Sequence, residues 1–105
     1  MMQHTGGCMC GAVRFKITGE PSRVTICHCT WCQRRTGTAF GAEAVFKLDR
    51  VRIADDALKV YRHISDESGS WLDQYFCPEC GTNISLILEA RPDIRTIAGG
   101  TFDDP

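Results

Sequence analysis

The chain has 105 residues, a formal net charge of −1 and seven cysteines. A single domain of this size has a small hydrophobic core, so cross-links are expected to add to its stability. The charge argues against a nucleic-acid partner, and the strand-sized apolar runs fall well short of the ~18 apolar residues of a membrane span, which argues against a membrane partner.

The first seven residues have no basic stretch followed by an apolar run, so no secretory signal is visible and a cytoplasmic location is expected. Thiols stay reduced in the cytoplasm. An odd number of cysteines would also leave one outside any complete set of internal disulfides. Metal binding is therefore the better interpretation of the cysteines.

Short β-rich runs separated by turn residues follow one another along the chain. Within the first, apolar and basic residues alternate, which places Val13, Phe15 and Ile17 on a buried face. The spacing of the runs predicts a mainly β domain of short antiparallel strands that occupies residues 1–105. The expected strands are Ala12–Thr18, Arg23–Cys27, Ala39–Phe46, Leu58–Ile64, Trp71–Phe76, Asn83–Glu89 and Ile94–Ala98.

At most one short helix is expected, near residues 30–36. Gly37 can end it in the left-handed conformation. The segment Asp55–Ala57 is expected to form a turn. Asp103 and Asp104 are expected to lie in a solvated tail, because adjacent side chains on an extended chain diverge.

The most specific local motif is Cys77-Pro78-Glu79-Cys80-Gly81. Two thiolates separated by two residues can share one tetrahedral zinc ion, and Gly81 permits the tight turn after the second ligand. The alternative is a redox CxxC, which belongs to a βαβ context that this sequence lacks. The missing half of the zinc site is expected to be Cys8 and Cys10, whose side chains point the same way on an extended segment.

The remaining three cysteines are Cys27, Cys29 and Cys32, which lie within six residues. Three thiolates with a vacant fourth position are the pattern of a catalytic zinc, and a thiol bound there would be held as the nucleophilic thiolate. Other ligand pairings are open at this point. One alternative is a closed site completed by His28, His4 or His63, and another is an iron–sulfur cluster.

The cysteine motifs and their flanks resemble the glutathione-dependent formaldehyde-activating enzyme family, whose members share a zinc-bearing β-tent fold. The resemblance covers most of the chain. It is carried by the segments Gly6-Gly7-Cys8-Met9-Cys10-Gly11-Ala12-Val13-Arg14-Phe15, Cys27-His28-Cys29-Thr30-Trp31-Cys32-Gln33-Arg34-Arg35-Thr36-Gly37, Phe76-Cys77-Pro78-Glu79-Cys80-Gly81-Thr82 and Gly99-Gly100-Thr101-Phe102-Asp103-Asp104-Pro105.

The resemblance implies two zinc ions per chain. It assigns Cys8, Cys10, Cys77 and Cys80 to a structural zinc, and Cys27, Cys29 and Cys32 to a catalytic one. It also implies a carbon–sulfur lyase step run in reverse, in which formaldehyde joins glutathione as S-hydroxymethylglutathione. Family members usually continue beyond this chain's last segment into further strands, so a truncated end and an open sheet edge that favours a homo-oligomer are expected.

Arg34 and Arg35 follow the three cysteines and are candidates to pair with the carboxylates of glutathione. The alternative for both is a cationic helix end or a solvated face. Two other functions are kept beside the glutathione reaction. One is a zinc-stabilised binding module that catalyses nothing, and the other is a lyase for a different small thiol.

Overall fold

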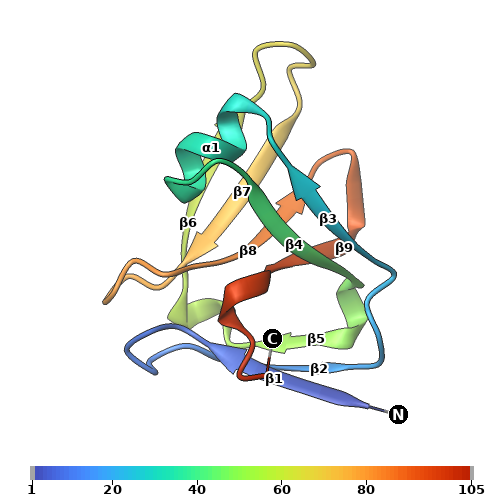
Figure 1. Ribbon diagram of the computed structural model, residues 1–105, viewed down its shortest axis with the longest axis vertical. Helices are drawn as coiled ribbons and strands as arrows, with labels where there is room; N and C mark the ends of the chain where they lie inside the picture. The colour runs from blue at the N-terminus through green and yellow to red at the C-terminus, as the bar shows by residue number, and fades with distance from the viewer. Residues whose placement is uncertain (1, 105) are drawn as a thin grey trace.

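The protein is described by a computed structural model that covers residues 2–104. Within them, the strands form two antiparallel sheets, which confirms the mainly β fold (Figure 1). The smaller sheet has the order β1-β2-β5, with β1 Gln3–Gly7, β2 Arg14–Thr18 and β5 Val51–Ile53. The larger sheet has the order β3-β4-β9-β8-β7-β6, with β3 Arg23–Cys27, β4 Gly41–Lys47, β9 Arg91–Ala98, β8 Asn83–Leu88, β7 Trp71–Phe76 and β6 Lys59–Ile64.

The seven expected strands are present, and the structure adds two that were not predicted. Strand β1 is polar and rich in glycine, and it is defined by its register against β2, from Gln3 opposite Thr18 to Gly7 opposite Arg14. Strand β5 has three residues, paired with β2 from Phe15 opposite Ile53 to Ile17 opposite Val51. Both strands depend on β2 for pairing, which a local pattern does not show.

The predicted helix is also present, as α1 Thr30–Thr36. Its C-cap, Gly37, has φ 72°, the left-handed conformation that was expected. The segment Asp55–Ala57 forms a 3-10 turn, η2, and two more such turns are η1 Leu48–Arg50 and η3 Gly99–Thr101. No helix in residues 2–104 has the length and apolar character needed to cross a membrane.

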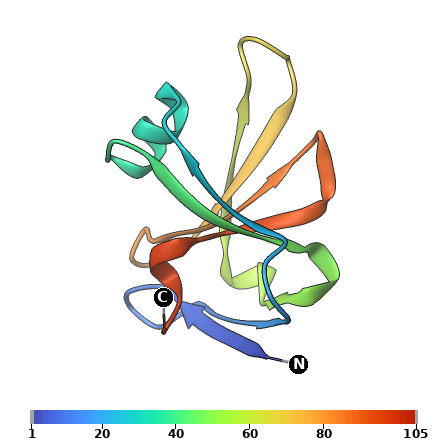
Figure 2. The same cartoon turned by 45° about the vertical axis from the view of Figure 1, so that its right-hand side comes forward.

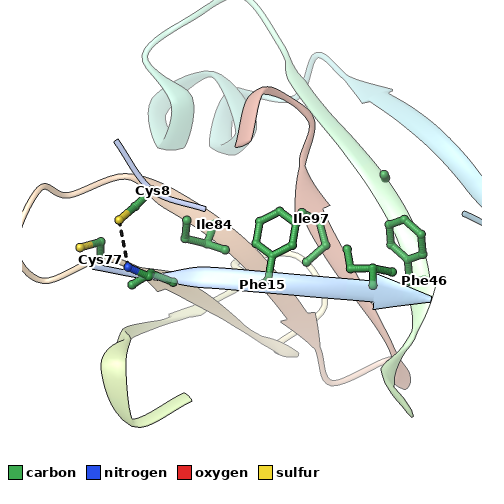
Figure 3. Close-up of a cluster of buried hydrophobic side chains, with 9 residues drawn as sticks. Cys8, Phe15, Phe46, Cys77, Ile84 and Ile97 are labelled. Atoms are coloured by element: carbon green, nitrogen blue, oxygen red, sulfur yellow. Dashed lines mark hydrogen bonds between the residues drawn. The ribbon is translucent and has the colours of Figure 1, made fainter. Parts of the chain in front are cut away.

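The hydrophobic core lies between the two sheets. Phe15 from β2 contacts a cluster that includes Phe46 from β4 and Ile97 from β9, and all three are buried (Figure 3). Val13, Phe15 and Ile17 are buried as the alternation predicted. Cys8 and Cys77 belong to the same cluster, so the edge of the core is made of sulfur-bearing side chains.

The segment after η3 returns to β1 instead of forming a free tail. Phe102 forms a bridge with Gly6, and the Asp103 N–H donates to the Thr5 carbonyl at 2.9 Å. Asp103 is thus solvent-exposed as expected, but it is held against β1 and does not lie in a free tail. Its carboxylate accepts hydrogen bonds from Arg14 and from the Thr5 hydroxyl, which lower its pKa to about 2.

Helix α1 and the β6–β7 hairpin rise side by side at the end of the large sheet that lies away from the small sheet (Figures 1 and 2). This arrangement places the helix, which follows Cys29 and carries Cys32, next to the hairpin tip. The two groups of cysteines consequently lie in different parts of the molecule.

Candidate metal centres

Four cysteines from two distant turns come together at the edge of the core. Cys8 and Cys10 lie in the turn after β1, where the Cys8 N–H donates to the Val13 carbonyl at 3.0 Å. Cys77 and Cys80 lie in the turn between β7 and β8, which is closed by the Gly81 N–H donating to the Cys77 carbonyl at 2.8 Å. All four sulfurs lie within 4.8 Å of one another.

The spacing of these sulfurs fits one zinc ion. The Cys8 and Cys10 sulfurs are 3.6 Å apart and those of Cys10 and Cys77 are 3.8 Å apart, whereas a tetrahedral zinc with ~2.3 Å bonds holds its sulfurs about 3.8 Å apart. All seven cysteines of the chain are free, and these separations are far longer than a disulfide bond. The group can therefore hold a metal ion.

The protein also prepares some of these sulfurs to carry charge. The Cys8 sulfur accepts a hydrogen bond from the Val13 N–H at 3.2 Å. Burial acts to raise the pKa of Cys8, but this bond and the Cys10 and Cys77 thiols lower it. Hydrogen bonds from Thr82 lower the pKa of Cys80 to about 5. The Ala12 backbone acts to lower the pKa of Cys10, but the neighbouring thiols raise it to about 12. A divalent cation would allow all four to ionise together.

The second group consists of Cys27, Cys29 and Cys32, whose sulfurs also lie within 4.8 Å of one another. Cys27 ends β3, Cys29 is the N-cap of α1, and Cys32 is buried on the first turn of the helix. No histidine belongs to this group within the described residues. His28 is exposed between two of the cysteines, and its ring lies 5.6 Å from that of Phe40.

The helix start brings a backbone donor to this group as well. The Cys29 sulfur accepts a hydrogen bond from the Cys32 N–H at 3.3 Å, and this bond lowers the pKa of Cys29 against the effect of burial. Burial raises the pKa of Cys32 to about 12, and the other two thiols add to that shift. Without a cation, the group therefore does not hold three thiolates at neutral pH.

A cavity of about 570 Å³ opens beside the three cysteines, between α1 and the β6–β7 hairpin. Trp31 and His63 both line it, and their rings stack on each other with centroids 5.5 Å apart and planes inclined by 24°. Its size is that of a small-molecule site. Its lining combines Cys29, Thr30, Trp31 and Arg34 from the helix side with His63, Ser65, Asp66 and Glu67 from the hairpin side.

Comparison with known protein families shows the family to which this chain belongs. The model of the glutathione-dependent formaldehyde-activating enzyme family matches residues 3–105. The chain belongs to this family. Both cysteine groups lie inside the matched region, so membership and geometry concern the same part of the molecule.

This formaldehyde-activating enzyme family member is similar to an uncharacterized lyase of Schizosaccharomyces pombe (strain 972 / ATCC 24843). The two are 26% identical over 84 residues, which cover 80% of this chain and 57% of the relative. The chain thus spans little more than half the length of that relative. A crystal structure of a Rhodobacter sphaeroides protein shares the fold, with a TM-score of 0.74, 20% identity and coverage of 96% of this chain and 89% of the other.

The two arginines that were proposed from the sequence to bind glutathione have different surroundings in this protein. Arg34 is exposed and lines the cavity. Arg35 points into the protein, where its side chain is 1% exposed and pairs with Glu43 at 2.7 Å. Contact with glutathione stays a prediction for both, and only Arg34 has a side chain that faces the cavity.

Two residues of the site were not identified from the sequence, and a third was considered only as a metal ligand. Asp66 and Glu67 reach the cavity because the β6–β7 hairpin folds against α1, and they carry no motif of their own; His63 lines the cavity and does not belong to the three-cysteine group. Glu43 lies on β4 among apolar neighbours, where a buried carboxylate is unusual. A single charged residue in a β-rich run was the only feature of the local sequence that could have indicated the ion pair with Arg35.

Proposed function

We propose that this protein is a zinc-dependent carbon–sulfur lyase-type enzyme that joins a small thiol, glutathione, to formaldehyde to give S-hydroxymethylglutathione. One observation carries the proposal. Three sulfurs lie within 4.8 Å of one another, with no fourth protein ligand among the described residues, and one of the three cysteines, Cys29, lines a cavity of about 570 Å³. Family membership and the lyase name of a relative support the same reaction class.

The two groups of cysteines have different roles in this proposal. Cys8, Cys10, Cys77 and Cys80 hold a structural zinc with four protein ligands. Cys27, Cys29 and Cys32 hold the second zinc and leave one coordination position to the substrate. When bound there, zinc supplies a Lewis acid that lowers the pKa of a thiol ligand and favours its nucleophilic form.

The charges around the cavity complement those of glutathione, which carries two carboxylates and one ammonium group. Arg34 on the helix side can pair with a carboxylate. Asp66 and Glu67 on the hairpin side can pair with the ammonium group. The stacked Trp31 and His63 rings provide an apolar wall for the rest of the molecule. The thiol is thereby oriented with its sulfur toward Cys29.

The reaction is an addition in which the sulfur of the thiol forms a bond to the formaldehyde carbon. The carbonyl π bond breaks, and its electron pair moves to the oxygen. The proton lost by the thiol is balanced by the proton gained by that oxygen, so no oxidant or reductant is consumed. The residues of the cavity bind and orient the thiol so that the carbon is attacked at close range.

The test is the rate of adduct formation by the zinc-loaded protein, followed by NMR with glutathione and formaldehyde. We expect acceleration over the uncatalysed addition. Because Arg34 binds one carboxylate, Arg34→Gln should raise KM for glutathione about tenfold, as expected for loss of a charge-assisted hydrogen bond of 1.5 kcal/mol or more. Arg52→Gln, on the distant strand β5, is the matched control and should leave KM unchanged.

Two results would redirect the proposal. No acceleration, together with two metal ions that carry only protein ligands, would identify a zinc-stabilised binding module. Calorimetric binding of another small thiol, with none of glutathione, would keep the lyase chemistry and change the substrate. A cytoplasmic location is part of the proposal, because the seven cysteines must stay reduced to bind metal.

A further inference from the structure

A buried ion pair lies beneath the three cysteines. Arg35 on α1 donates from Nη2 to Glu43 Oε1 on β4 at 2.7 Å, and the two side chains are 1% and 7% exposed. The other carboxylate oxygen accepts a hydrogen bond from the Thr96 hydroxyl at 3.4 Å. Taking two charges out of water is costly, so a pair at this depth must be well compensated.

The carboxylate alone does not satisfy the guanidinium. Arg35 Nε and Nη1 are buried and have no hydrogen-bond partner among residues 2–104. Arginine and carboxylate usually pair through two parallel hydrogen bonds, but here a single nitrogen reaches Glu43. The Trp31 ring, whose centroid lies 5.0 Å from the guanidinium carbon, covers one face of the cation but accepts no conventional hydrogen bond. Donors remain on a buried cation.

The nearby groups that can accept hydrogen bonds from these donors are the sulfurs of the three-cysteine group. Cys32 and Arg35 are three residues apart on α1 and therefore lie on one side of the helix. Both converge on Gly41, where an added Cβ would lie 2.6 Å from Arg35 Nη2 and 3.7 Å from the Cys32 sulfur. Gly41 in turn is paired with Cys27 across the β3–β4 ladder. The guanidinium also acts to lower the pKa of Cys32, although burial dominates that pKa.

We propose that Arg35 is a positioning residue of the three-cysteine centre: fixed by Glu43, its guanidinium donates a hydrogen bond to the Cys32 thiolate and offsets the negative charge of the loaded site. Three thiolates around one divalent ion leave a net negative charge, and one of the three, Cys32, is buried next to the ion pair. A cation held next to a ligand sulfur stabilises that charge and fixes the orientation of the ligand, as partners of metal ligands commonly do. This inference rests on the proposed function, because it needs a metal at that centre.

The test compares how tightly each centre holds zinc. The zinc-loaded protein is titrated with a chelator, and the Cβ chemical shifts of Cys27 and Cys77 report metal loss at the two centres separately. In Arg35→Met the three-cysteine centre should release its ion at a chelator concentration about tenfold lower or more. The four-cysteine centre should be unchanged and is an internal control. Arg62→Met, which breaks the ion pair with Asp73 instead, is the matched control variant.

A second variant separates loss of the arginine from the effect of a stranded carboxylate. Arg35→Met leaves Glu43 as an uncompensated buried charge, which alone can disturb the fold. In Arg35→Met/Glu43→Gln no buried charge is left, so the fold should be kept. If the double variant still releases zinc from the three-cysteine centre about tenfold more readily, the proposal stands. If zinc retention returns to that of the unmodified protein, the proposal is overturned.

The outcomes also distinguish this inference from the proposed function. If Cys27, Cys29 and Cys32 bind no metal in the unmodified protein, the proposed function fails, and this inference fails with it. If they bind zinc, but the double variant and the unmodified protein release it at the same chelator concentration, only the role of Arg35 is refuted.

Discussion

At the scale of single residues, Gly6 lies where the small sheet, the core and the C-terminal segment meet. A Cβ added to it would lie 2.3 Å from the Thr101 carbonyl oxygen and 2.4 Å from the Phe15 ring. The first contact is with backbone and the second is with a buried ring, so neither can move aside without disturbing the packing around it. Position 6 therefore has no space for a side chain, and glycine is required there.

We therefore expect Gly6→Ala to lower the free energy of unfolding by about 1–3 kcal/mol, the usual cost of overpacking. Urea unfolding of the zinc-loaded protein measures it. Gly100→Ala is the control, because a Cβ there meets no atom within 4 Å, and a change of at most about 0.5 kcal/mol is expected for it. Equal stability of the two variants would show that the close approach at Gly6 does not exist.

Single residues also show where sequence reasoning succeeds. The alternation in β2 was sufficient to place Val13, Phe15 and Ile17 in the core, because a strand with one buried face has a period of two. The inward direction of Arg35 was not predictable. Arg34 and Arg35 are identical side chains at adjacent positions, and only the docking of α1 on β4 buries one and exposes the other.

At the scale of elements, the cavity depends on α1 and the β6–β7 hairpin together. The helix supplies Trp31 and the hairpin supplies His63, and the two rings form one stack. Neither element alone encloses a site. The position of the hairpin tip relative to the helix therefore sets the width of the cavity.

His63→Ala should weaken glutathione binding about two- to tenfold, because loss of a stacking partner costs about 0.5–1.5 kcal/mol. Calorimetric titration of the zinc-loaded variant measures the change, and its metal content should stay the same. Tyr61→Ala is the control, since Tyr61 lies on the same strand and does not line the cavity. Unchanged binding in both variants would place the ligand elsewhere.

Elements whose own sequence shows a pattern were predicted well. Strands that form only by pairing with a neighbouring strand were not. Helix α1 begins and ends at the predicted residues, and Gly37 marks its end as the sequence indicated. Strand β1 has one buried residue, Gly6, so it has no apolar alternation to find. Strand β5 is too short for a period to show. Both become strands only because β2 offers an edge on each side.

At the scale of the whole molecule, the two groups of cysteines differ in how much chain they enclose. The four-cysteine group ties residues 8–10 to residues 77–80, whereas the three-cysteine group lies within residues 27–32. By analogy with disulfides, the longer closure contributes on the order of 4 kcal/mol and the short one about half of that. The gathering of the four was predictable from motif chemistry, and their contact with the hydrophobic core was not.

Cys10→Ser should therefore lower the urea midpoint of the metal-loaded protein more than Cys29→Ser does. Both cysteines are exposed, so loss of packing does not separate the two variants. Protons compete with metal for the sulfurs. The difference between the variants should accordingly shrink as the pH falls from 7 to 5 and the unmodified protein loses its metal. A larger effect of Cys29→Ser would mean that the short group carries the stability.

The separation of the two groups along the chain has a consequence for biosynthesis. Cys27, Cys29 and Cys32 leave the ribosome within six residues of one another, so the short group can capture its ion while the nascent chain is still growing. The other group is completed only when Cys80 has emerged. Loading can thereby be ordered in time: the three-cysteine site can fill first, and the four-cysteine site, which joins the turn after β1 to the turn between β7 and β8, can close only later in synthesis.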